Sequence, residues 1–140
     1  MSLSTVILDV QDALAAAMVT VLASETGATV YKGPVMVPTI VPMAYVVVNS
    51  GDRVPTDSTP TSDGYELSIT VGVAVGRSGA LAERRVEYLD AARLAILAAL
   101  GPSAGVYMPQ VTGFAFDDNN LDDRVGFAIS ATCRTVVNRT

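Results

Sequence analysis

The sequence predicts an α+β protein, in which an antiparallel or mixed β-sheet packs against two helices. Two segments repeat apolar residues at the three- and four-residue spacing of an amphipathic helix. Several shorter segments instead alternate apolar and polar residues, as half-buried strands do. The expected order of elements is α-β-β-β-α-β-β. At 140 residues, the chain is expected to form a single domain over positions 1–140.

The first predicted helix covers residues 3–24, and Gly27 is placed to stop it. Its apolar stripe consists of Leu3, Val6, Ile7, Val10, Leu14, Met18 and Val21. Much of the remaining surface is alanine. Simple helix propensity explains these alanines, and so does packing against a neighbouring subunit. On the second interpretation, Ala13, Ala16 and Ala17 are candidate subunit contacts.

Two strands and a long loop are expected next. Strands are predicted at 28–32 and 43–48, and the proline-broken segment 33–42 between them suits only the edge of a sheet. Residues 49–64 are rich in Gly, Pro, Ser, Thr and Asp, which predicts a long, flexible loop, and loops of this length are usually either functional or disordered. Its charged residues, Asp52, Arg53, Asp57 and Asp63, are candidates for an assembly role.

The clearest strand covers residues 65–75. One face carries Tyr65 and a run of Leu, Ile and Val; the other is small and nearly uncharged. A solvent-facing surface normally carries longer polar groups, so a helix or a partner is expected to cover this second face.

The second predicted helix covers residues 81–100 and ends at Gly101-Pro102. Its buried stripe is expected to be Val86, Leu89, Ile96, Leu97 and Leu100. Two charge pairs at three-residue spacing, Arg84 with Glu87 and Asp90 with Arg93, should lie on its polar side. Arg84 and Arg85 near its start belong either to a solvated face or to a subunit contact.

The C-terminal part predicts an antiparallel hairpin, with strands at 111–116 and 124–137 around a polar turn at 117–123. The turn fails as a calcium loop, because Asp123 replaces the required glycine and Ile129 replaces the bidentate glutamate. Asn and Asp are also the residues that tight turns favour. Cys133 falls in an apolar strand register and is expected to be a buried structural thiol.

The residue types disfavour an enzyme. The chain has no histidine and one cysteine, so the commonest general base is missing and an intramolecular disulfide is impossible. We expect no catalytic, cofactor-binding or metal-binding residues.

The surface composition favours assembly with other proteins. Charged residues make up 16% of the chain, against about 25% in ordinary soluble domains, and the net charge of −5 comes without a basic stripe for nucleic acid. The longest uncharged stretches are broken by proline and glycine, so no membrane span is expected there. The excess apolar surface therefore predicts protein partners. The alternative is a small, dimeric ligand-binding or regulatory domain.

The layout resembles the tail terminator (tail completion) proteins of siphophages and the related small head–tail joining proteins. The resemblance covers nearly the whole chain as a pattern of elements. Its parts are the N-terminal helix, the proline-broken edge, the long loop, SITVGVAV followed by ALAERRVEYLDAARLAILAALG, and the closing VGFAISATCRTVV.

This resemblance implies a tail-terminator-like domain that forms a hexameric ring. The ring would cap the tail tube protein, contact the head connector protein, and let DNA pass without specific binding. The expected location is the virion tail, assembled in the host cytoplasm. The family has no catalytic residues. Loop 49–64 would project toward the tube or the lumen, where Asp52, Arg53, Asp57 and Asp63 would be its candidate lining residues. An acidic lining by the loop or by residues 117–123 would repel DNA phosphates.

Overall fold

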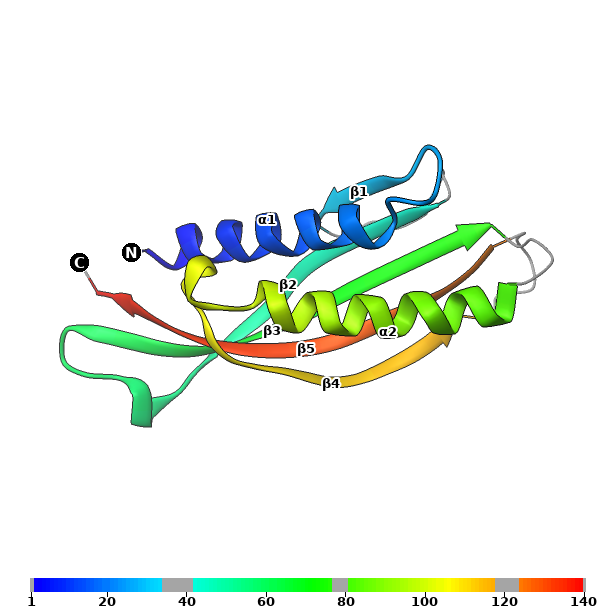
Figure 1. Cartoon of the computed structure of the whole chain (residues 1–140). Helices are drawn as coiled ribbons and strands as arrows, with labels where there is room; N and C mark the ends of the chain where they lie inside the picture. The colour runs from blue at the N-terminus through cyan, green and yellow to red at the C-terminus, as the bar shows by residue number, and fades with distance from the viewer. Residues whose placement is uncertain (1, 34–41, 77–80, 118–123, 140) are drawn as a thin grey trace.

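The computed structural model describes residues 2–33, 42–76, 81–117 and 124–139, and in them two long helices lie on one face of a five-stranded sheet (Figure 1). The predicted fold class and order of elements are confirmed. In chain order the elements are α1 (Leu3–Val21), β1 (Thr29–Lys32), β2 (Met43–Arg53), β3 (Ser62–Gly76), α2 (Leu81–Ala99), β4 (Tyr107–Asp117) and β5 (Arg124–Asn138). Most of the predicted proline segment 33–42, namely residues 34–41, and most of the predicted turn 117–123, namely residues 118–123, lie outside the described residues.

The sheet is mixed, with the strand order β1-β2-β3-β5-β4. β1 pairs with β2 in parallel, and every other described pair is antiparallel, including the predicted β4–β5 hairpin. The chain leaves β3, crosses through α2 and enters β4, and β5 then inserts between these two strands. β1 and β4 are therefore the two edges of the sheet.

The core lies between the helices and one face of the sheet. Val6, Val10, Leu14 and Met18 of α1 are fully buried, as their spacing predicted, and the Ser2 side chain caps the helix by accepting the Thr5 N–H at 3.2 Å. By length and composition alone α1 could cross a membrane, a test that core helices of soluble proteins also pass. The sheet contributes the alternate apolar residues of β3 and β5, from Leu67 to Val75 and from Phe127 to Val137.

The buried stripe of α2 differs from the prediction, since Leu89 and Leu97 are only half-buried and Ala92 takes part in the stripe. Ala92, Ile96 and Leu100 are buried, but Val86 is 55% exposed. Val86 lies ten residues before Ile96, which rotates it by about 80° around the helix. α2 contacts β5 and the edge strand β4, so a side chain rotated toward that edge leaves the core.

The predicted long loop at 49–64 is wrong in its extent. β2 continues to Arg53 and β3 begins at Ser62, and a short 3₁₀ helix, Pro55–Asp57, lies between them. Ladder hydrogen bonds use backbone groups only, so polar composition does not prevent pairing. β5 supplies the third strand here, because Ser62 pairs with Asn138 and Gly64 with Val136.

The strands are longer than the helices that cover them. β3 and β5 each have 15 residues, about 50 Å of strand, whereas α1 and α2 each have 19 residues, about 28 Å of helix. The β2–β3 end therefore projects beyond the helices, as Figure 1 shows at lower left. We call residues 50–64 the hairpin arm.

Candidate assembly surfaces

One face of the sheet has no helix against it. Core residues of all central strands point to the side of α1 and α2, so their alternate neighbours point away. We call the central part of this surface the open sheet face, made of Tyr45, Val47, Ser68, Thr70, Gly72, Ala74, Ala128, Ser130 and Thr132. Glu66 and Arg134 continue the same side of the sheet toward the hairpin arm. Among the described elements only the 3₁₀ helix reaches it, at the Gly64 end. The nearly uncharged face predicted from the sequence is thus bare within the protomer.

The hairpin arm is tied to the rest of the sheet by Asp57. Its Oδ2 accepts a hydrogen bond from the Tyr107 hydroxyl at 3.0 Å and lies 3.5 Å from Arg134 Nη1. Partial burial, and then the hydrogen bond to Asp57, raise the pKa of Tyr107. Arg134 also lies 3.9 Å from Glu66 on β3. The base of the arm is therefore linked to β4 and β5.

A second link joins the arm to the end of β5. Asp63 Oδ1 lies 3.0 Å from Arg139 Nη2 and 3.5 Å from Arg53 Nε. Arg139 also donates to the Pro60 carbonyl at 3.1 Å. Of the four residues proposed for this region, Arg53, Asp57 and Asp63 are thus ion-paired, and Asp52 has no partner among the described residues. The acidic character expected of the arm is therefore largely compensated.

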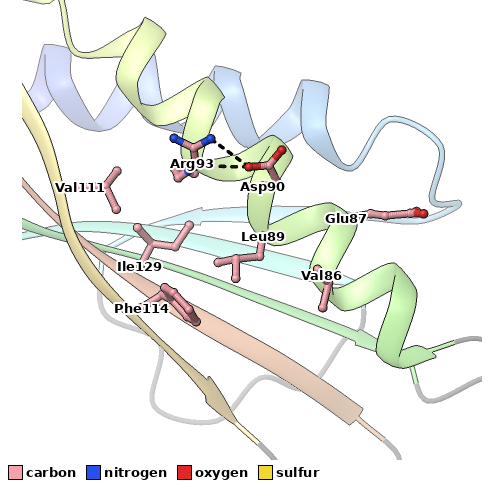
Figure 2. A pocket seen from close by; sticks show the side chains of 8 residues that line it. All are labelled: Val86, Glu87, Leu89, Asp90, Arg93, Val111, Phe114 and Ile129. Atoms are coloured by element: carbon pink, nitrogen blue, oxygen red, sulfur yellow. Dashed lines mark hydrogen bonds and ion pairs between the residues drawn. The ribbon is translucent and has the colours of Figure 1, made fainter.

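A groove opens between α2 and the β4 edge (Figure 2). It has a volume of about 530 Å³, and its lining residues are Val86, Glu87, Leu89, Asp90, Arg93, Val111, Phe114 and Ile129. Figure 2 shows Val86 and Leu89 pointing toward Phe114 and Ile129, with the charged residues on the helix side. The predicted Asp90–Arg93 pair is confirmed, with Arg93 Nη2 at 3.0 Å from Asp90 Oδ1.

Sequence reasoning did not find this groove, because its formation depends on a β-bulge. Val111 pairs with Ala131 and Phe114 with Ile129, and the register shifts between them. The extra residue puts Phe114 on the helix side of the sheet, where it is 59% exposed. Gly113, which interrupts the strand alternation, is the local sequence signal for such a bulge.

The proposed arginine contacts have different outcomes. Arg85 lies over the Phe116 ring with its Cζ 4.3 Å from the ring centroid, and Phe116 in turn packs edge-to-face on Phe114 at 5.5 Å. Arg85 is therefore engaged with β4 inside the protomer. The side chain of Arg84 lies outside the described residues.

The alanines of α1 divide between inside and outside. Ala13 and Ala17 pack against the protomer's own core, and Ala16 is exposed. Leu8 and Val19 are also exposed on α1, at 60% and 59%. We call Leu8, Asp12, Ala16 and Val19 the outer face of α1. Lys32 of the edge strand β1 reaches this face, with its Nζ 2.7 Å from Asp12 Oδ1.

The described residues include no cluster of three or more His, Cys, Asp or Glu side chains arranged to hold a metal ion. Cys133 is fully buried, as predicted. Burial, and then the charge of Glu66, raise the pKa of its thiol to about 11. A protonated, inaccessible thiol is a poor nucleophile.

The fold defines this chain as a two-layer α+β protein, and chains of solved structures have a similar fold. No protein-family model and no curated protein sequence matches the chain. Its fold is similar to a chain of the structure titled "Virion of native gene transfer agent (GTA) particle", with a TM-score of 0.55 and 14% sequence identity. The match covers 91% of this chain and 94% of that chain. At this identity the likeness shows a shared fold.

Proposed function

We propose that this protein is a structural component of a phage-like virion. It assembles as a ring, hexameric by family resemblance, that caps the tail tube and forms the joint to the head connector. The observation that carries the proposal is the fold match to a chain of a gene transfer agent virion, which covers nearly all of both chains. The siphophage tail terminator layout of the sequence supports the more specific role.

The shape of the protomer supports assembly. The open sheet face consists mostly of small, neutral side chains and has no helix against it, so another protein surface can cover it. The hairpin arm projects past the helices and is tied down by Asp57 and Asp63, so it can present a defined shape to a tube or connector subunit. Such a rigid extension loses little conformational entropy on binding.

The charges support passage of DNA without binding. Phosphate-driven binding requires uncompensated Lys and Arg side chains. Arg53 in the arm, and Arg134 and Arg139 at the C-terminal end of the chain beside it, each lie against a carboxylate. An arm that faces the lumen would therefore be close to neutral, rather than strongly acidic, and would give DNA no strong grip.

The proposal is tested by polymerising the tail tube protein of the same phage with and without this protein. Electron microscopy should show shorter tubes with a ring at one end when this protein is added. A matched variant, Ser130→Lys at an exposed position of the open sheet face, should remain folded and lose capping. Tubes of unchanged length and bare ends with the wild-type protein would refute the proposal.

The groove favours one alternative, a dimeric ligand-binding or regulatory domain, because it is mostly apolar and of ligand-like volume. Light scattering of the purified protein and small-molecule binding followed by thermal shift address this alternative. A ligand-stabilised dimer that does not cap tubes would support it.

A further inference from the structure

We propose that the groove between α2 and β4 receives the outer face of α1 from a second copy of this chain. The contact is heterologous, since the two surfaces belong to different parts of the protomer. The inference deepens the proposed ring by naming the subunit interface, and it rests on the proposed function only for ring closure.

The groove offers exposed apolar surface that association would remove from water. Val86 is 55% exposed and Phe114 is 59% exposed, and Leu89 lies between them in Figure 2. Exposed apolar clusters of this kind mark interaction sites, and their burial favours association.

Strand addition at the same edge is disfavoured. β4 carries Pro109, which lacks an N–H, and two register shifts that interrupt regular pairing with its neighbour. Proline and bulges are the features by which natural edge strands avoid pairing with other chains. A partner should therefore dock through side chains in the groove rather than extend the sheet.

The outer face of α1 is also exposed and partly apolar, like the groove. Leu8 and Val19 lie eleven residues apart, about three turns, so both point in one direction with about 16 Å between their turns. This direction is opposite to the buried stripe of Val6, Val10, Leu14 and Met18. Ala16 has only a methyl side chain, so another backbone can approach the helix closely at this point.

The charges of the two surfaces are complementary. The groove rim carries two acids and one base: Asp90 is paired with Arg93, and Glu87 has no partner among the described residues. The outer face of α1 carries the exposed Asp12–Lys32 pair. Docking brings Lys32 to Glu87 and Asp12 to Arg93. Both existing pairs are solvent-exposed, so exchanging partners costs little.

The placement of the two surfaces makes the contact head-to-tail. Lys32, which reaches the outer face of α1, belongs to the β1 edge, and the groove lies at the β4 edge, so the two surfaces lie toward opposite sides of the protomer. Heterologous contacts of this type propagate in one direction, and they form a ring when the rotation closes.

Two blocked variants test the docking. Val86→Asp with Phe114→Ser blocks the groove, and Leu8→Asp with Val19→Asp blocks the outer face of α1. All four side chains are more than half exposed, so the fold should persist, which circular dichroism and urea unfolding verify. By sedimentation velocity each variant alone should be monomeric, while an equimolar mixture should form a heterodimer and nothing larger.

The contrary outcomes are equally specific. A mixture that stays monomeric, a single variant that assembles like the wild type, or a wild-type protein that stays monomeric up to millimolar concentration would overturn the proposal. No tail protein is present, so this result is independent of tube capping. A heterodimer from a protein that fails to cap tubes would overturn the proposed function and leave the interface standing.

A charge exchange provides a second measurement. Glu87→Lys and Lys32→Glu should each weaken self-association about five-fold, and the double variant should restore most of the loss. Losses that simply add in the double variant would show that these side chains do not meet.

Discussion

The ring of Tyr45 on β2 lies directly over Gly72, its cross-strand partner on β3, and occupies the space where a side chain at position 72 would begin. The contact lies on the open sheet face, so it shapes the surface that we propose for assembly. Gly72 is buried beneath the ring, in a strand interior where glycine is otherwise unfavourable.

Gly72→Ala should therefore destabilise the protein by about 1–3 kcal/mol, because the new methyl group overlaps the Tyr45 ring. Gly113→Ala is the matched control: it lies on the same sheet, and nothing within 4 Å would meet the added Cβ. Urea unfolding measures both variants. Equal, negligible effects would show that Tyr45 moves freely away from Gly72.

Met108 is the one non-glycine residue with positive φ in the described part of the chain, at 52°. The left-handed region costs a side-chain-bearing residue about 1–2 kcal/mol, and Met108 is 54% exposed, so it recovers little by burial. Met108→Gly should raise the free energy of unfolding by up to about 1 kcal/mol. Met108→Ala retains the strain and should change little, and a loss of stability in the glycine variant would contradict the argument.

The buried thiol of Cys133 predicts a pH dependence. Its pKa is raised from the ordinary value of 9.0 to about 11, so between these values the unfolded state loses the proton while the folded state keeps it. The contribution of the protonated thiol to stability is complete below the pKa of the unfolded state. It is lost as the pH rises through the pKa of the folded state, by about 1.4 kcal/mol per pH unit. Urea unfolding from pH 8 to 11 should show that the free energy of unfolding falls more steeply with pH in the wild type than in Cys133→Ala. Parallel curves for the two proteins would refute the prediction.

Asp57→Asn should lower stability by about 1 kcal/mol at low salt and less at high salt, because it weakens the contacts with Arg134 and Tyr107. The control is Asp52→Asn, since Asp52 has no partner among the described residues and pairs in register with Glu66. Removing one of two facing like charges should be neutral or slightly stabilising. If both variants lose the same stability, the Asp57 links do not hold the arm.

Local pattern was sufficient where one element buries one face. The spacing from Val6 to Met18 predicted the core side of α1, and the alternation in β3 and β5 predicted both faces of the central sheet, including the burial of Cys133. These signals are strong because a period of 3.6 or 2 sorts apolar residues to one side whatever the partner is.

The loop predicted from composition was wrong where backbone hydrogen bonds with neighbouring strands decide the structure. Residues 50–53 and 62–64 have loop-like side chains, but ladder hydrogen bonds with β3 and β5 make them strand. Periodicity also does not show where along the sheet a helical residue packs. Val86 lies next to the β4 edge, and it is therefore exposed instead of buried.

By itself, the sequence determined the α+β class, the order of elements, and a neutral strand face with few charges to solvate it. Only the tertiary structure decided that both helices lie on the opposite face, that Asp57 and Asp63 are neutralised by distant arginines, and that a bulge in β4 opens a groove beside Phe114. The physical reason is distance along the chain: Arg134 follows Asp57 by 77 residues and Phe114 follows Val86 by 28, so folding alone brings them together.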